Sequence, residues 1–333
     1  MTTGVNMFCF TACYAVALAL EVMGLWYRPR WRRLATVVAA VAGIVAHTWY
    51  LAQRASQSPW APLSSQHDWY LAAAWVLALI YVGLVLYQPR APMGLFLLPI
   101  MLALIAAAYW ASVEPMASFQ APRVWGLLHG IFLMLGTVAV LLGFVAGVMY
   151  LVQSYRLKHK LPTGERFRLP SLEWLERMNA RSLAAAAVLV ALGFVTGALM
   201  RLAQRDGGGL PWTDPVVLST SGMLSWLVAA EAFRLAYPAA RRGRKVAYLT
   251  LAGFVFLVIT LAAFLTADSM HGRGANGANS NREVSNVLPA PSPWRGALGR
   301  GDEADTSVEI GTHFLTPPLT PPPQGEGNGG SSS

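Results

Sequence analysis

Long apolar stretches separated by short polar loops fill residues 5–268 of this chain. They lie near residues 5–27, 34–53, 69–88, 94–113, 125–152, 182–203, 215–236 and 246–267. Each is close to or above the roughly 20 apolar residues that a helix needs to cross the hydrocarbon core of a membrane. Because the backbone inside lipid must satisfy its own hydrogen bonds, the stretches are predicted to be helices. The pattern therefore predicts an all-α, polytopic membrane helix bundle with eight transmembrane helices.

Two segments depart from this pattern. In the loop 154–181, the run LPSLEWLERM places apolar and charged residues at helical spacing, which predicts an interfacial amphipathic helix. The end of the chain is rich in Pro, Gly and Ser and cannot bury a core. We expect an N-terminal four-helix membrane half over residues 1–120, a second membrane domain over 121–271 and a disordered tail over 272–333.

The composition agrees with a membrane protein. Hydrophobic residues make up 55% of the chain and charged residues 12%, whereas soluble domains carry about 25% charged residues. The net charge of +9 is spread over short loops, and the chain carries no nucleic-acid-binding motif. The basic residues therefore indicate topology, and nucleic acid is excluded as a partner.

Lys and Arg gather in alternate loops, which gives the orientation. The rich set comprises the loops at 28–33, 90, 156–181 and 234–245, and the poor set contains only Arg54, Arg123, Arg201 and Arg205 up to the end of the last span. The positive-inside rule places the rich set in the cytoplasm. Both termini are then expected to lie outside.

Four of the six histidines fall toward the outer face in this topology: His47, His67, His129 and His271. Imidazole is the usual axial ligand of heme iron and a common ligand of Zn or Cu. No HExxH or CxxC spacing supports a bare metal site. A single such histidine is often only an interfacial anchor, so the hypothesis of a ligand site rests on the set. His47 could donate a hydrogen bond between helices or act as a heme ligand deeper in the membrane, and we favour the hydrogen bond.

The loop before the seventh span offers further ligand-binding chemistry. It reads GGGLPWTDP over residues 207–215, and its glycines allow close approach of the backbone to a ligand. Trp212 presents a flat apolar face and Asp214 an acceptor, while Trp125 adds aromatic surface. The alternative for the tryptophans is the aromatic belt that membrane proteins place at the interface.

These segments resemble a known family. Residues 125–271 are similar to the cytochrome c assembly domain of heme-handling membrane proteins, which include the CcsA, CcmC and HemX-like groups. The matching stretches are WGLLHGIFLMLGTVAVLLGFVAGVMYLVQSYRLKHK, LPSLEWLERMNARS, GFVTGAL, WTDP, GRKVAYLTLAGF and MHG. Upstream, AHTWYLAQ, WYLAAAWVLALIYVGLVLY and MGLFLLP resemble the N-terminal half of the eight-helix HemX-like members.

The resemblance implies that two histidines flanking a tryptophan-rich outer loop ligate heme iron, and His129 and His271 occupy those places. The loop is degenerate: Trp212, Asp214 and Pro215 match, but the place of the family's lysine holds Val216. The place of an intramembrane histidine found in better-known members holds Arg234. These departures favour heme binding or a supporting role over a complete synthetase on one chain.

The predicted function is a component of cytochrome c assembly in the bacterial cytoplasmic (inner) membrane, crossing it several times and binding or presenting heme at the outer face. Heme would be held between His129 and His271, with Trp212 against the porphyrin and Arg123, Arg201 or Arg205 near its propionates. Expected partners are other assembly subunits, apocytochrome c and the lipid bilayer. A heme chaperone or part of a heme lyase complex is favoured over a stand-alone enzyme. The alternative is a HemX-like membrane regulator of tetrapyrrole synthesis that acts by protein contact without heme.

Overall fold

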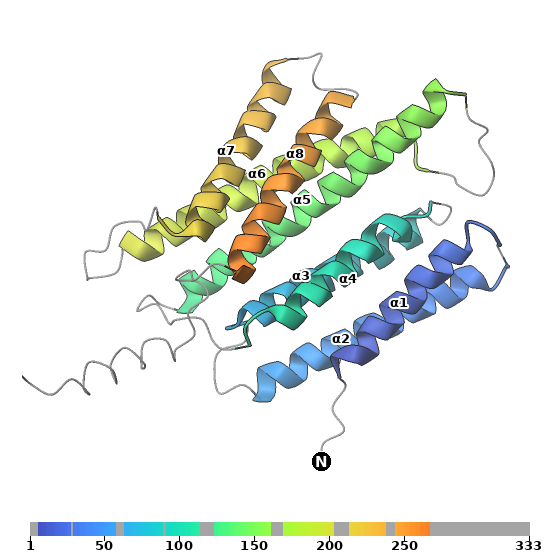
Figure 1. Cartoon of the computed structure of the whole chain (residues 1–333), viewed down its shortest axis with the longest axis horizontal. Helices are drawn as coiled ribbons and strands as arrows, with labels where there is room; N and C mark the ends of the chain where they lie inside the picture. Colours follow the sequence, from blue (N-terminus) through green and yellow to red (C-terminus); the bar gives the residue numbers. More distant parts are fainter. Residues whose placement is uncertain are drawn as a thin grey trace, which may run out of the picture. The chain divides into compact units, whose positions relative to one another are not determined.

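The computed structural model describes residues 6–27, 29–57, 63–88, 91–113, 123–160, 169–202, 213–237 and 244–266. Within these ranges it contains eight α-helices and no strand (Figure 1). The helices are α1 Met7–Met23, α2 Arg32–Gln57, α3 Gln66–Tyr87, α4 Gly94–Trp110, α5 Arg123–Lys158, α6 Leu172–Leu202, α7 Pro215–Ala236 and α8 Arg244–Thr266. The prediction of an all-α fold is confirmed, and every predicted apolar stretch contains a helix.

Six of the helices are long and apolar enough to cross a membrane. The other two, α1 and α4, are apolar but have 17 residues each, which is about 25 Å at a rise of about 1.5 Å per residue. That length is slightly below the roughly 30 Å of a bilayer's hydrocarbon core. The eight-span topology and the location of the termini stay predictions.

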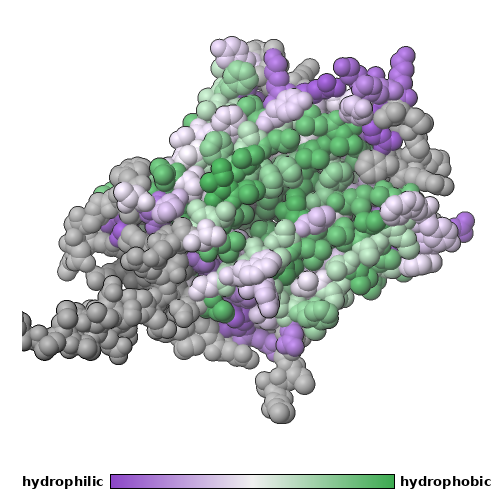
Figure 2. Space-filling model, in the orientation of Figure 1, coloured by the Kyte–Doolittle hydropathy of each residue, from purple (hydrophilic) through white to green (hydrophobic). Residues whose placement is uncertain are grey.

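The apolar faces that the helices leave uncovered agree with a lipid environment. On α2, Val38, Val41 and Val45 are exposed in succession, and on α6 Val188 and Val195 are exposed. Figure 2 shows hydrophobic residues along the middle of the helices and hydrophilic ones toward their ends. Contiguous apolar surface of this kind is rare on soluble monomers, so the fold is that of a multi-pass membrane protein.

Helices that follow one another in the chain pack as antiparallel neighbours, as the pairs α1–α2, α3–α4, α5–α6 and α7–α8 (Figure 1). The pairs are joined by contacts of α1 with α4, of α3 with α5 and of α8 with α5. The long helix α5 therefore touches helices from both halves of the chain, and a site on its surface can be built from several helices.

One expectation about local structure is confirmed only in part. The segment around Leu172–Met178 was expected to form an interfacial amphipathic helix; it is helical, but it forms the first turns of α6. No Gly or Pro interrupts the helix before Gly193, and Leu175 and Asn179 are buried. A Cβ added to Gly143 of α5 would lie 3.4 Å from Ser182 Cβ and 3.8 Å from Asn179 Oδ1. This part of α6 thus packs against α5, which removes the reason for the segment to lie flat on the membrane.

The remaining domain expectations stay predictions. Contacts divide the chain into one unit of residues Met1–Ser285 and a second of Asn286–Ser333. All described residues belong to the first unit. The expected disordered tail, residues 272–333, lies outside the described residues.

Candidate functional site

Two of the described histidines, His67 and His129, lie at the same end of the bundle. This end is formed by the first turns of α3, α5 and α7 and the last turns of α2, α4, α6 and α8, and we call it the His129 end. Hydrogen bonds connect these turns: Tyr70 Oη donates to the carbonyl of Leu261 at 3.0 Å. The side chain of Gln66 donates to the carbonyl of Phe264, also at 3.0 Å. The start of α3 is therefore held against the end of α8.

A cavity of about 210 Å³ lies at the His129 end. Its walls come from six helices, with Trp69 of α3, Leu104 of α4, His129 of α5, Arg201 of α6, Val216 of α7 and Phe264 of α8 among the lining residues. Most of the lining is aliphatic or aromatic. His129 supplies the one imidazole and Arg201 the one formal charge among the described lining residues.

His129 is held in a defined chemical form. Its Nδ1 lies 2.7 Å from the carbonyl oxygen of Gly193 in α6. Because a carbonyl can only accept, Nδ1 carries the proton, and in the neutral ring the lone pair is then on Nε2. Metal-ligating histidines in proteins are usually oriented in this way, with the other ring nitrogen donating to a carbonyl or carboxylate. The geometry suits coordination through Nε2.

Close packing of α5 and α6 makes this contact possible. A Cβ at Gly193 would lie 2.5 Å from Leu133 Cδ2, and one at Gly197 would lie 2.7 Å from His129 Cε1. The two glycines are four residues apart, so they lie on the same face of α6. In lipid, small residues at such spacing let helix backbones approach closely. The sequence therefore fixes the helix separation at the height of His129.

Trp69 is a wall residue that sequence reasoning missed. It begins the apolar run of α3 and lines the cavity, and its ring is so close to α5 that a Cβ at Gly130 would lie 2.3 Å from Cζ2. A tryptophan in the first turns of a membrane helix is typical of the interfacial belt, so its type and position gave no signal. Gly130, directly after His129, was the available clue, because a glycine in a helix often marks close approach.

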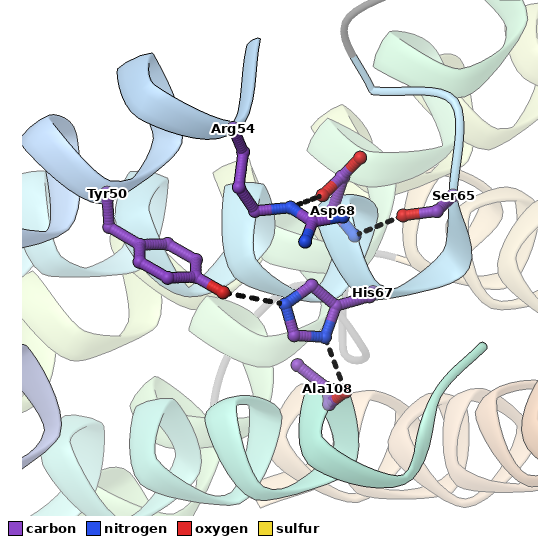
Figure 3. Close-up of polar contacts among 6 residues, drawn as sticks. All are labelled: Tyr50, Arg54, Ser65, His67, Asp68 and Ala108. Carbon is purple, nitrogen blue, oxygen red and sulfur yellow. Dashed lines mark hydrogen bonds and ion pairs between the residues drawn. The ribbon is translucent and has the colours of Figure 1, made fainter. Parts of the chain in front are cut away.

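His67 does not line the cavity. It is the second residue of α3, and it is 7% exposed. Its Nδ1 donates to the carbonyl of Ala108 at 2.7 Å, and Tyr50 Oη lies 3.4 Å from its Nε2 (Figure 3). Beside it, Arg54 and Asp68 form an ion pair at 2.7 Å (Figure 3). His67 thus connects α2, α3 and α4, which is a structural role.

His47 is fully buried between α1 and α2, away from the cavity. Phe10 stacks on its ring at a centroid distance of 4.2 Å, and Tyr14 Oη lies 3.5 Å from its Nδ1. Its Nε2 has no hydrogen-bond partner among the described residues. The contact with Tyr14 agrees with the hydrogen bond between helices that we favoured for His47. A role of His47 in holding a cofactor stays a prediction.

Asp214 caps a helix. It is 6% exposed, and its Oδ1 accepts from the backbone N–H of Val216 at 2.8 Å and of Val217 at 3.4 Å. Pro215 occupies the first position of α7, as is common after a capping residue. Since Val216 lines the cavity, the cap fixes the start of α7 beside it.

The other predicted site residues are only partly described. Trp125 lies in the first turn of α5 and is 43% exposed. Arg123 is the first residue of α5, but its side chain lies outside the described part of the structure. Trp212, Arg205 and His271 also lie outside it. Of the predicted set, the structure therefore brings His129, Arg201 and the start of α7 behind Asp214 to the same cavity.

The fold and the site together define a class of protein: a helical membrane protein with an imidazole on the wall of an apolar cavity. Residues 63–269 match the model of the cytochrome c assembly protein family, and the chain belongs to that family. The match begins just before α3 and so includes all six helices that line the cavity. The chain is also 23% identical over 259 residues to the cytochrome c biogenesis protein CcsA of Guillardia theta, covering 71% of this chain and 84% of that protein. No solved structure matches the chain.

Proposed function

We propose that this family member binds or presents heme for cytochrome c assembly at the outer face of the bacterial cytoplasmic membrane. The observation that carries the proposal is His129, whose Nδ1–H is fixed by the Gly193 carbonyl and whose ring lies on the wall of an apolar cavity. The matched family model supports it, since the family works in cytochrome c assembly.

The chemistry of the cavity fits heme better than a bare metal ion. Within the described ranges no three His, Cys, Asp or Glu side chains lie close enough to hold an ion. A single imidazole among apolar walls instead suits a metal whose other ligands come from an organic ring. Arg201 provides a cation for a propionate, and Trp69 provides an aromatic face.

The full site extends beyond the described residues in this proposal. The cavity's 210 Å³ is below the roughly 300–1,000 Å³ typical of small-molecule sites. In the sequence, residues 203–212 follow α6 and residues 267–271 follow α8, and these two stretches carry Arg205, Trp212 and His271. We propose that His271 is the second axial ligand, that Trp212 covers the porphyrin, and that Arg123 and Arg205 join Arg201 near the propionates.

The proposed topology has eight spans with both termini outside, which places the His129 end at the outer face. The membrane domain over residues 121–271 would carry the axial ligands, and the half over 1–120 would support it through α3 and α4. Heme supplies the vinyl groups that react with the thiols of an apocytochrome. This chain would bind, orient and hand over heme, with apocytochrome c and other assembly subunits as partners, and would act as a chaperone or part of a lyase complex.

An absorption spectrum of the detergent-purified chain tests the proposal. We expect a Soret band after purification or after addition of hemin, and loss of most of it in His129→Ala and in His271→Ala. His159→Ala is the matched control, because His159 follows the opposite end of α5, where it contacts Tyr155. If wild-type protein takes up no heme, or if both ligand variants keep the same spectrum, the heme proposal fails and a HemX-like regulator acting by protein contact becomes the better reading.

A further inference from the structure

We infer that Gly193 and Gly197 of α6 are the positioning residues that make His129 a ligand through Nε2. The inference deepens the proposed function and rests on it for the identity of the ligand. The tautomer of the His129 imidazole follows from contacts within the chain and can be tested without any ligand.

Gly193 acts through its carbonyl. That oxygen accepts from His129 Nδ1 at 2.7 Å and from the hydroxyl of Thr196 at 2.9 Å. Free imidazole side chains in water favour the opposite tautomer, with the proton on Nε2. A carbonyl facing Nδ1 disfavours that form, because two lone pairs would then meet. The contact with Gly193 therefore selects the tautomer that leaves Nε2 able to coordinate.

Gly197 acts through the absence of a side chain. A Cβ there would lie 2.7 Å from His129 Cε1 and 2.9 Å from Nδ1, distances that no real contact tolerates. Even alanine would force the ring away from α6 and lengthen its hydrogen bond to Gly193. Any larger residue would push it further. The glycine thus leaves room for the ring at the position where its Nδ1–H meets the carbonyl.

Nitrogen NMR of the full-length chain in detergent, labelled with ¹⁵N-histidine, tests this directly. The signals of His129 are assigned by their loss in His129→Gln. We expect a protonated Nδ1 and an unprotonated Nε2 in the wild type, and a shift toward a protonated Nε2 in Gly197→Ala. A wild-type ring protonated on Nε2, or an unchanged spectrum in Gly197→Ala, overturns the inference.

Two other glycines give matched controls for the same chemical change. A Cβ at Gly222 of α7 has nothing within 4 Å, so Gly222→Ala should leave the tautomer unchanged and should not lower the thermal stability. A Cβ at Gly136 would lie 2.7 Å from Val190 Cγ2, at the same α5–α6 interface but away from His129. Gly136→Ala should lower stability while the His129 signals stay as in the wild type. If it moves those signals as Gly197→Ala does, the effect belongs to the interface as a whole and the inference is wrong.

A double variant keeps the inference testable if Gly197→Ala folds poorly. Because the added methyl group clashes with the imidazole, Gly197→Ala should destabilise the wild-type chain but have little effect in a His129→Ala background. An equal loss of melting temperature in both backgrounds contradicts the proposed contact.

Hemin titration adds the functional consequence. Residues that orient a metal ligand typically change metal affinity by about 10–100-fold, and we expect Gly197→Ala to weaken heme binding within that range. A Gly197→Ala chain that shows the altered tautomer but binds hemin as tightly as the wild type refutes the positioning role. A wild-type chain that shows the expected tautomer but binds no hemin refutes the proposed function. The assignment of the His129 tautomer would still hold in that case.

Discussion

At the scale of single residues, two histidines at the same end of the bundle have the same form and different surroundings. His129 and His67 each place Nδ1 at 2.7 Å from a backbone carbonyl. The Nε2 of His67 meets the hydroxyl of Tyr50 and the residue is 7% exposed, whereas His129 lines a cavity. The hydrogen bond that prepares an imidazole for coordination is therefore insufficient by itself, and access to a cavity distinguishes the candidate ligand.

Asp214 gives a first prediction, because a helix cap and a ligand contact respond differently to substitution. Asp214→Asn keeps an oxygen that can accept from Val216 and Val217 and should preserve stability. Asp214→Ala should lower the free energy of unfolding by about 1 kcal/mol, measured as a lower melting temperature in detergent. A loss of heme in Asp214→Asn at unchanged melting temperature would instead show that the carboxylate touches the ligand.

Arg201 gives a second prediction, since it is the charged group among the described lining residues of the cavity. A hydrogen bond to a charged group contributes about 1.5–3 kcal/mol, so Arg201→Gln should weaken hemin binding by about 10–100-fold. Hemin dimethyl ester, which lacks the carboxylates, should bind both chains alike. The control is Arg177→Gln, which removes an exposed arginine paired with Glu173. Equal losses for hemin and its ester would show that Arg201 supports the fold and does not contact a propionate.

At the scale of helices, α3 is linked to the C-terminal helices as well as to its neighbour α4. It contributes Trp69 and Tyr70 to the cavity and bonds to the last turns of α8. The family match beginning at residue 63 agrees with this arrangement. The cavity therefore depends on α3 being held at a fixed height against α8.

Tyr70→Phe tests this dependence. The variant keeps the ring and removes the hydroxyl that donates to Leu261, which should cost about 0.5–1.5 kcal/mol. Thermal unfolding in detergent should show a lower melting temperature, whereas Tyr155→Phe, at a residue that is 57% exposed, should leave it unchanged. If the two variants unfold alike, the α3–α8 hydrogen bond contributes nothing measurable to the fold.

The helices could be predicted from the sequence, because the length and hydropathy of each apolar stretch are enough to indicate a membrane helix. Each expected stretch contains a helix. The extension of α6 to Leu172 could not be predicted, because it depends on the packing of Asn179 against α5 and on the burial of Leu175. The cap at Asp214 could have been read from an acidic residue followed by Pro215. The contact of His129 with Gly193 joins residues 64 positions apart and follows from the register of two helices, which no local pattern shows.

At the scale of the whole molecule, function depends on which membrane face carries the His129 end. Maturation of c-type cytochromes requires heme outside the cytoplasm, so a cavity facing inward could not serve the proposed transfer. The structure places His129 and the cavity at one end of α5, and the basic residues Arg156 and Lys158 lie in the last turn of that helix, at its other end. Combined with the positive-inside rule, this arrangement predicts that the His129 end lies at the outer face.

Labelling of single cysteines in intact cells tests this assignment. In a chain whose two native cysteines are replaced by serine, Ser118→Cys and Gly208→Cys should react with a membrane-impermeant maleimide. Thr163→Cys should react only after the cells are opened, because it lies in the basic loop between α5 and α6. The reverse pattern would place the cavity at the cytoplasmic side and remove the physical basis for heme delivery.

The N-terminus provides the sharpest test of the number of spans, because α1 is one of the two shorter helices. Its 17 residues reach about 25 Å, and a thin hydrocarbon region or local bilayer thinning is enough to accommodate that mismatch. Buried contacts also hold it in the bundle, since Phe10 and Tyr14 pack on His47 of α2. We therefore expect α1 to cross the membrane, so that Thr2→Cys reacts from outside together with Ser118→Cys. Protection of position 2 alone would mean that α1 does not cross, and the bundle would then have seven spans with its N-terminus inside while the His129 end keeps its orientation.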